Sequence, residues 1–218
     1  YYGKPAAQFT AEFMVNKWGV PAEDKGDWGD AAVAPQYVNN ITFAYHNREA
    51  STIYEASAAP VKLFNVVPQI VNVPRGASFT LTWGDDDNNA LRYCYLSAYI
   101  DLNADGDFSD EGELIKVAGT KGAQNSAVSE GSVNVLLPYN MPLGLTHVRM
   151  RFDGAWKNDG YNAETKAYDA KATLNRMCYE IILNITEYSS TASRIAVETN
   201  NSEWGTVWVA TDETPSDG

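Results

Sequence analysis

Strict alternation of apolar and polar residues is the feature that most constrains the fold of this 218-residue chain. In residues 77–83, Phe79, Leu81 and Trp83 share one face of an extended strand, and small polar residues share the other. A period of two with β-branched and aromatic residues is typical of half-buried strands in antiparallel sheets. We therefore predict an all-β fold, an antiparallel β-sandwich. The other strands are expected at residues 37–45, 61–66, 93–101, 113–117, 132–137, 146–152 and 177–185.

The alternation also assigns side chains to faces. In residues 146–152 it directs every second residue, from Val148 to Phe152, into the core. The residues between them are predicted to face solvent, and they are His147, Arg149 and Arg151. The two cysteines, Cys94 and Cys178, fall on opposite faces of their strands by the same reasoning. Because a disulfide needs converging Cβ vectors, we expect two free thiols.

Composition changes along the chain and predicts three parts. Residues 1–35 are rich in Ala, Gly, Asp and Pro and are expected to form an extension or linker. Residues 36–188 hold the sandwich. Residues 189–218 are expected to form a linker and a C-terminal β-hairpin extension, which either packs on the sandwich or begins another β-module. The chain starts at Tyr1 without Met or an apolar leader, and we expect it to be a mature or trimmed segment.

The charge balance narrows the range of functions. There are 28 Asp and Glu residues against 16 Lys and Arg, a formal net charge of −12. Such a chain repels phosphate, so we expect no nucleic-acid partner. No apolar run reaches the length of a membrane helix, so we expect no membrane insertion. With only two His residues and no nucleophile motif, we expect no enzymatic activity and no catalytic residues.

The segment from Asp101 to Glu113 is the most specific string in the sequence. Oxygen-bearing side chains stand at its first, third and fifth positions, and Gly106 stands at its sixth, as in the first half of a calcium loop. We predict a structural Ca²⁺ ion there. The predicted ligands are Asp101, Asn103, Asp105, Asp107 and Glu113. The twelfth position, where an EF-hand has a bidentate carboxylate, is Gly112. The alternative is therefore an acidic turn without metal, in which the carboxylates accept hydrogen bonds from backbone N–H groups.

A second candidate site lies in residues 153–176, a long polar segment between two predicted strands. Segments of that length inside a compact domain are usually functional or disordered. Its aromatic rings could stack on sugar rings, and its polar side chains could bind hydroxyl groups, which predicts glycan or another surface polymer as the ligand. The predicted ligand-binding residues are Trp156, Tyr161, Asp159 and Asn162. Alternatively, the aromatic residues anchor this segment on the sandwich.

The acidic string carries a resemblance to a known family. Residues 99–113, read as YIDLNADGDFSDEGE, resemble the hallmark of GEVED-type domains of secreted and surface bacterial proteins. Residues 37–43, 73–81 and 144–152 resemble further strands of that family in the same order, so the resemblance covers about residues 36–188. The motif that names the family is degenerate here, where the chain reads NRMCYEI and only Glu180 is acidic. Residues 197–207 are similar to short Gly-Thr-Val β-repeats.

The resemblance implies a non-catalytic accessory module of a larger exported bacterial protein. Such modules accompany glycoside hydrolases, peptidases or adhesins, so other domains of the same parent protein are the expected partners. The expected location is extracellular, at the cell surface or periplasmic. The alternatives are a purely structural spacer or adhesin module, or an accessory region of a glycoside hydrolase or peptidase whose catalytic domain lies outside this chain.

Overall fold

The computed structural model describes residues 17–24, 37–45, 48–58, 60–84, 91–123, 126, 128 and 130–187. The chain divides into two units, residues 1–188 and residues 189–218. The second unit lies outside the described residues, and so does the predicted C-terminal hairpin. Within the described part, no helix has the length and hydrophobicity needed to span a membrane.

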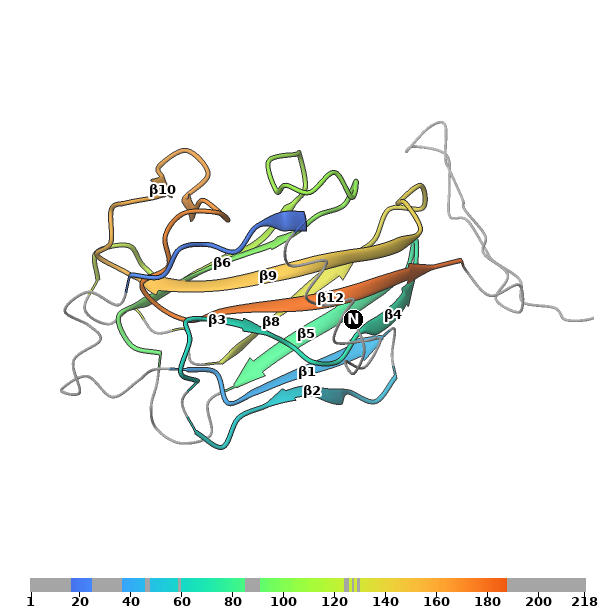
Figure 1. The fold of residues 1–218 in the computed structure, drawn as a ribbon, viewed down its shortest axis with the longest axis horizontal. Helices are drawn as coiled ribbons and strands as arrows, with labels where there is room; N and C mark the ends of the chain where they lie inside the picture. Colours follow the sequence, from blue (N-terminus) through green and yellow to red (C-terminus); the bar gives the residue numbers. More distant parts are fainter. Residues whose placement is uncertain are drawn as a thin grey trace, which may run out of the picture. The chain divides into compact units, whose positions relative to one another are not determined.

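Two large β-sheets and one two-stranded hairpin hold the strands of the described part of the first unit, and the large sheets confirm the predicted β-sandwich (Figure 1). The four-stranded sheet has the order β2 (Ser51–Glu55), β1 (Asn40–Tyr45), β5 (Ser78–Gly84), β8 (Gly131–Leu136). The six-stranded sheet has the order β3 (Phe64–Val66), β12 (Cys178–Thr186), β9 (Gly144–Gly154), β6 (Cys94–Ile100), β7 (Leu114–Ala118), and β4 (Val71–Pro74) also pairs with β12. A small hairpin, β10 (Tyr161–Asn162) and β11 (Ala167–Tyr168), lies in the segment between β9 and β12.

Two features of the sheets depart from the sequence prediction. β3 and β4 run parallel to β12, whereas every other pairing is antiparallel among the described strands. The strands β2, β4, β10 and β11 were not predicted. All four have five residues or fewer, which is too short for a period of two to stand out.

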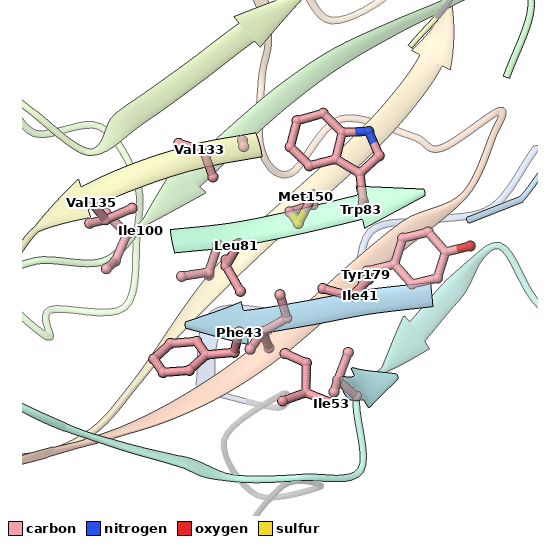
Figure 2. Close-up of a cluster of buried hydrophobic side chains, with 14 of the residues drawn as sticks. Ile41, Phe43, Ile53, Leu81, Trp83, Ile100, Val133, Val135, Met150 and Tyr179 are labelled. Carbon is pink, nitrogen blue, oxygen red and sulfur yellow. The ribbon is translucent and has the colours of Figure 1, made fainter. Parts of the chain in front are cut away.

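A dry core fills the space between the two sheets. Phe79, Leu81 and Trp83 of β5 are buried, as their alternation predicts. Figure 2 shows side chains from both sheets gathered in this core, including Leu81 and Trp83 from one sheet and Met150 from the other. The indole N–H of Trp83 donates to the carbonyl of Val128 at 3.0 Å, so its one polar group is satisfied inside the core.

The opposite face of the six-stranded sheet overturns a prediction. His147, Arg149 and Arg151, expected to face solvent, are each 0% exposed. Residues 17–24 and the segment that carries β10 lie on this side of the sheet, away from β1 and β5 (Figure 1). The alternation correctly separated apolar from polar residues, but it could not tell a solvated face from one covered by irregular chain.

A second, smaller apolar cluster forms under this cover. It joins the covering segments to the sheet, and its buried members are Trp18, Tyr99, Phe108, Ala167, Ala170 and Ile182. Residues 17–24, the described part of the predicted extension, are also tied down by their backbone. Asp24 N–H donates to the carbonyl of Leu174, and Leu174 N–H donates to the carbonyl of Ala22, both at 2.7 Å.

The two cysteines form no disulfide, as predicted, and both are buried. Cys94 lies on the core face of β6 with Leu96, whereas Cys178 starts β12 on the side of Glu180. Burial raises the pKa of both thiols to about 12, so they stay protonated at neutral pH.

Candidate functional site

The loop between β6 and β7, residues 101–113, folds around two inward-facing carboxylates. Asp101 is buried, and its Oδ1 accepts the backbone N–H of Ala104 at 2.6 Å. Its Oδ2 accepts the backbone N–H of Gly106 at 3.0 Å and the indole N–H of Trp18. The left-handed φ of +60° at Ala104 and +98° at Gly106 makes this tight turn possible. Asp101 therefore acts as the central acceptor of the loop.

Glu113 closes the same loop from its other end. It is buried, and its two carboxylate oxygens accept the backbone N–H groups of Leu102 at 2.9 Å and Asp110 at 3.1 Å. Burial raises the pKa of Glu113, and these two hydrogen bonds oppose that shift without cancelling it. Two of the five predicted metal ligands, Asp101 and Glu113, thus use their oxygens to hold the backbone of the loop.

The remaining acidic side chains gather on the outer side of the loop. The carboxylate oxygens of Asp105, Asp107 and Asp110 lie within 4.8 Å of one another. Asn103 Nδ2 donates to Asp105 at 3.0 Å and to Asp110 at 2.5 Å. Three carboxylates at this spacing are the donor type that hard cations such as Ca²⁺ prefer, so the residues fit such an ion. The sequence analysis did not assign Asp110, although it stands three residues after Asp107 in the same string.

Asp107 is held in its charged form. Its Oδ1 accepts both the backbone N–H and the hydroxyl of Ser109, at 2.8 and 2.6 Å. These hydrogen bonds lower the pKa of Asp107, and Lys171 adds to the effect.

The long segment after β9 is anchored to the sheet by tyrosines. Tyr168 is buried, its N–H donates to Ser97 Oγ at 2.9 Å, and its carbonyl accepts the hydroxyl of Tyr99. The Tyr168 hydroxyl lies 2.9 Å from the carbonyl oxygen of Gly154 and 2.5 Å from that of Lys157. Burial raises the pKa of Tyr99 and of Tyr168, which keeps both phenols neutral. The predicted alternative, aromatic anchoring, holds for Tyr168.

Buried ion pairs fasten the same segment. Arg149 binds both oxygens of Glu180, at 2.8 and 3.1 Å, and donates to the carbonyls of Ala170 at 3.0 Å and Gly19 at 2.8 Å. Nδ1 of His147 contacts the Glu180 carboxylate. Burial alone would raise the pKa of Glu180, but His147 and Arg149 outweigh it and lower the pKa.

A second pair lies beside the first. Arg151 binds both oxygens of Asp153, at 2.6 and 2.9 Å, and donates to the carbonyls of Asp169 and Ala172. Lys157 adds a third charge, with Nζ 3.4 Å from Asp153. The carbonyl groups of the long segment therefore complete the hydrogen bonding of the buried arginines.

The four predicted ligand-binding residues are distributed over more than one place. Trp156 is 42% exposed, and its ring lies 5.6 Å from that of Tyr93. Tyr161 is half-buried and packs edge-on against Tyr168, with ring centroids 5.3 Å apart. Asn162 uses its Oδ1 to accept the backbone N–H groups of residues 164 and 165, and Asp159 is exposed.

Trp156 lines a hollow that we call the Trp156 recess, with a volume of about 210 Å³. Its lining residues are Tyr93, Gly154, Trp156, Lys157, Asn175 and Arg176. Tyr93 has a left-handed φ of +57°, and its carbonyl accepts the N–H of Ala155 at 2.6 Å, so the backbone next to Trp156 is fixed. The sequence analysis missed Tyr93, Asn175 and Arg176, which are separated from Trp156 along the chain and carry no common pattern.

Asn162 lines a different and larger hollow, which we call the inter-loop cavity. Its volume is about 440 Å³, and it lies between residues 107–114 and residues 162–171. Its charged lining residues are Asp107, Asp110, Asp169 and Lys171. The two candidate loops, predicted as separate sites, therefore share one cavity.

Comparison with known proteins gives one match to a family model. Residues 95–173, from β6 to the covering segment, match the family model of the GEVED domain. No curated protein matches the chain.

Proposed function

We propose that the chain is a non-catalytic accessory module of a larger exported bacterial protein, because residues 95–173 match the family model of the GEVED domain. In this proposal it binds glycan at the Trp156 recess and holds a structural Ca²⁺ ion in the acidic loop. The observation that carries the proposal is the half-exposed indole of Trp156 at a preformed recess. Single exposed apolar residues are common, so the exposure of Trp156 supports a binding role only together with the recess and its polar lining.

The chemistry of the Trp156 recess suits a sugar ring. The indole of Trp156 offers a flat apolar surface to the C–H groups of a ring, and Lys157, Asn175 and Arg176 supply hydrogen-bond donors around it. The recess is small, so one ring at a time would enter it. Pockets that combine an apolar surface with a few placed polar groups are the usual form of small-ligand sites.

A calcium ion would occupy the outer side of the acidic loop. Asp105, Asp107 and Asp110 would supply carboxylate oxygens, while Asp101 and Glu113 keep the backbone in place from the inner side. This proposal adds Asp110 to the predicted ligand set. It removes Asp101, Asn103 and Glu113, whose side-chain oxygens accept backbone N–H groups within the loop. The ion would offset the repulsion among three clustered carboxylates, a structural role.

The proposed setting follows from the family and the charge. The proposal places the module outside the cytoplasm, at the cell surface or in the periplasm, beside other domains of its parent protein. A net charge of −12 disfavours nucleic acid as a partner. A structural spacer is the competing function, and it requires no ligand at Trp156.

A glycan array with wild type and Trp156→Ala tests the binding function. We expect the variant to lose at least about tenfold in affinity for the best array ligand, because stacking on one aromatic ring is a dominant contribution in such sites. Its melting temperature should stay within about 2 °C, because Trp156 is half-exposed. Tyr139→Ala, which removes another exposed aromatic ring, is the matched control and should bind as wild type does.

Two results would contradict the glycan proposal. An array without any ligand would favour the structural spacer. A large fall in the melting temperature of Trp156→Ala would show that Trp156 anchors the segment instead.

Thermal unfolding in EDTA and then in CaCl₂ tests the calcium proposal. At about tenfold excess over Kd, an ion that binds only the folded state adds about 1.4 kcal/mol, a rise of about 3–5 °C. Asp105→Asn should lose this rise, and Asp159→Asn, an exposed carboxylate outside the cluster, should keep it. An unchanged melting temperature in wild type, with no calcium bound in a direct titration, would identify the loop as an acidic turn without metal.

A further inference from the structure

The inter-loop cavity is separate from the Trp156 recess, since the two share no lining residue. At about 440 Å³ it falls in the size range of small-ligand pockets. Its apolar and aromatic lining, with Tyr99, Phe108 and Leu114, is buried or half-buried, whereas most of its polar lining is exposed. That combination lets a ring-shaped ligand place one face on the apolar lining and its polar groups outward.

The walls of the cavity are held in place before any ligand binds. The hydroxyl of Tyr99 is bonded to the carbonyl of Tyr168 in the covering segment. Farther along that segment, the carbonyls of Asp169 and Ala170 accept hydrogen bonds from the buried Arg151 and Arg149. A pre-organised wall reduces the entropy lost on binding.

The charged lining of the cavity is unbalanced. Asp107, Asp110 and Asp169 contribute three carboxylates, and Lys171 contributes one ammonium group. Lys171 Nζ already lies 3.3 Å from the carbonyl oxygen of Gly106, across the gap between the two loops. The cavity therefore carries two excess negative charges, which attract a cationic group and repel carboxylate, sulfate and phosphate groups.

The neutral polar lining favours hydroxyl groups next to that cation. Ser109, Asn162 and Thr165 line the cavity together with the carboxylates. Asn162 uses its Oδ1 on the backbone, which leaves its amide N–H₂ group as a donor for a ligand. A simple alkyl amine would not use these groups, whereas a sugar ring that carries an amine would.

We propose that the inter-loop cavity is a second binding site and that it takes an amino sugar, with the protonated amine at Asp107, Asp110 and Asp169 and the ring hydroxyl groups at the neutral polar side chains. This site does not depend on Trp156. It shares Asp107 and Asp110 with the proposed calcium site, so Ca²⁺ and the amine would compete for these carboxylates.

The test is a titration with methyl β-glucosaminide, followed by NMR of the backbone amides in EDTA, so that no cation occupies the acidic loop. Shifts are expected in residues 107–110 and 162–171 of the wild type, and they should persist in Trp156→Ala. Methyl β-glucoside and the N-acetylated glycoside, which lack the charge, should bind at least about fivefold more weakly. Butylamine, which lacks the ring, should also bind more weakly.

Three charge variants sharpen the test. Asp169→Asn removes one negative charge but keeps an oxygen for the N–H of Lys171, and it should weaken binding about fivefold. Lys171→Met removes the competing cation and should strengthen binding. Glu164→Gln, an exposed carboxylate of the same segment outside the cavity, should leave the affinity unchanged.

The outcomes separate this site from the Trp156 recess. Equal affinity for the charged and uncharged glycosides would overturn the proposal, and so would butylamine binding as tightly as the glycoside. Shifts that map to Trp156 and vanish in Trp156→Ala would assign the ligand to the recess instead. Equal effects of Asp169→Asn and Glu164→Gln would show that binding depends only on the overall charge of the protein, and this would overturn the proposal.

Discussion

The two faces of the six-stranded sheet are buried by different chemistry. On one face, Val148, Met150 and Phe152 of β9 pack against the second sheet in a dry core. On the other, the residues between them, Arg149 and Arg151, are equally buried, with charges inside. An apolar side chain stabilises the fold by about 25 cal/mol for each Å² of its surface that is removed from water, and it needs no specific partner. Charged burial needs a partner for every donor, since an uncompensated buried charge is costly.

This requirement explains why irregular segments can cover the charged face. Arg149 and Arg151 each bind one carboxylate and donate further N–H groups to backbone carbonyls of the covering chain. A covering β-sheet would use its carbonyls within its own ladder, whereas a loop has them free. The charged face therefore positions residues 169–172, of which Asp169, Ala170 and Lys171 line the inter-loop cavity.

The largest effect is expected in the dry core. Phe152→Ala removes a ring that contacts Trp83 and Tyr179, with centroids 6.3 and 6.0 Å away. Both sides of the ring lie in packed sheets that cannot collapse into the cavity, so we expect a loss of about 4 kcal/mol in urea unfolding. The exposed Leu136→Ala is the control and should cost about 0.5 kcal/mol or less. A cost for Phe152→Ala below about 1.5 kcal/mol would mean that the two sheets pack loosely.

On the charged face, Glu180→Gln should cost about 3 kcal/mol, because it leaves Arg149 without its negative partner. If the face is stabilised by pairing and not by charge itself, the combined Arg149→Met and Glu180→Leu variant should recover most of that loss. A double variant as unstable as Glu180→Gln would show that the carbonyl contacts of Arg149, rather than its pair with Glu180, hold the cover.

The pH dependence of stability also distinguishes the two faces of the sheet. The pKa of Glu180 is lower in the folded protein than in the unfolded chain, where it is about 4.3. The ionised Glu180 therefore stabilises the fold fully above the unfolded-state pKa, and this stabilisation is lost as the pH falls through the folded-state pKa. The stability gap between wild type and Glu180→Gln should therefore be widest at neutral pH and shrink below about pH 4. Glu113, whose pKa is raised, acts in the opposite direction in both proteins and cancels in the difference. Urea unfolding at several pH values measures the gap, and a constant gap would contradict the pairing.

The sequence predicted one face of this sheet well and the other poorly, for a physical reason. Alternation reports which residues are apolar, and apolar residues are nearly always buried on one side of a sheet. It does not report what covers the polar side, because the cover comes from residues 17–24 and 155–176, which lack periodicity. The pairing of β3 and β4 parallel to β12 is a tertiary feature of the same kind.

The candidate sites show a similar limit. The spacing of carboxylates from Asp101 to Glu113 located an acidic loop correctly. Which carboxylates turn inward depends on the left-handed backbone at Ala104 and Gly106, and residue types alone do not specify it for Ala104. The inter-loop cavity was unpredictable because residues 107–114 and 162–171 meet only through the folded sheet.

Trp18→Phe tests the cover itself and should cost about 2 kcal/mol. The variant keeps a ring beside His147, 4.2 Å away between centroids, but it removes the N–H donor to the buried Asp101. Hydrogen bonds to charged groups contribute about 1.5–3 kcal/mol. Trp156→Phe, at a half-exposed position, is the control and should change the stability by about 0.5 kcal/mol or less. If Trp18→Phe leaves the free energy of unfolding unchanged, residues 17–24 cover the charged face without stabilising it.

The smallest effect is expected from an arginine–glutamate pair that is exposed to solvent. Arg75 binds both oxygens of Glu187, at 2.7 and 3.2 Å, as Arg149 binds Glu180, but the two side chains are 33% and 60% exposed. Water solvates either partner when the other is removed, so a double-mutant cycle with Arg75→Ala and Glu187→Ala should give a coupling of about 0.5 kcal/mol or less. High salt should reduce that coupling further, because salt screens exposed charges more than buried ones. A coupling above about 1.5 kcal/mol would mean that bidentate geometry, and not burial, sets the strength of both pairs, and the contrast between the two faces would then need another explanation.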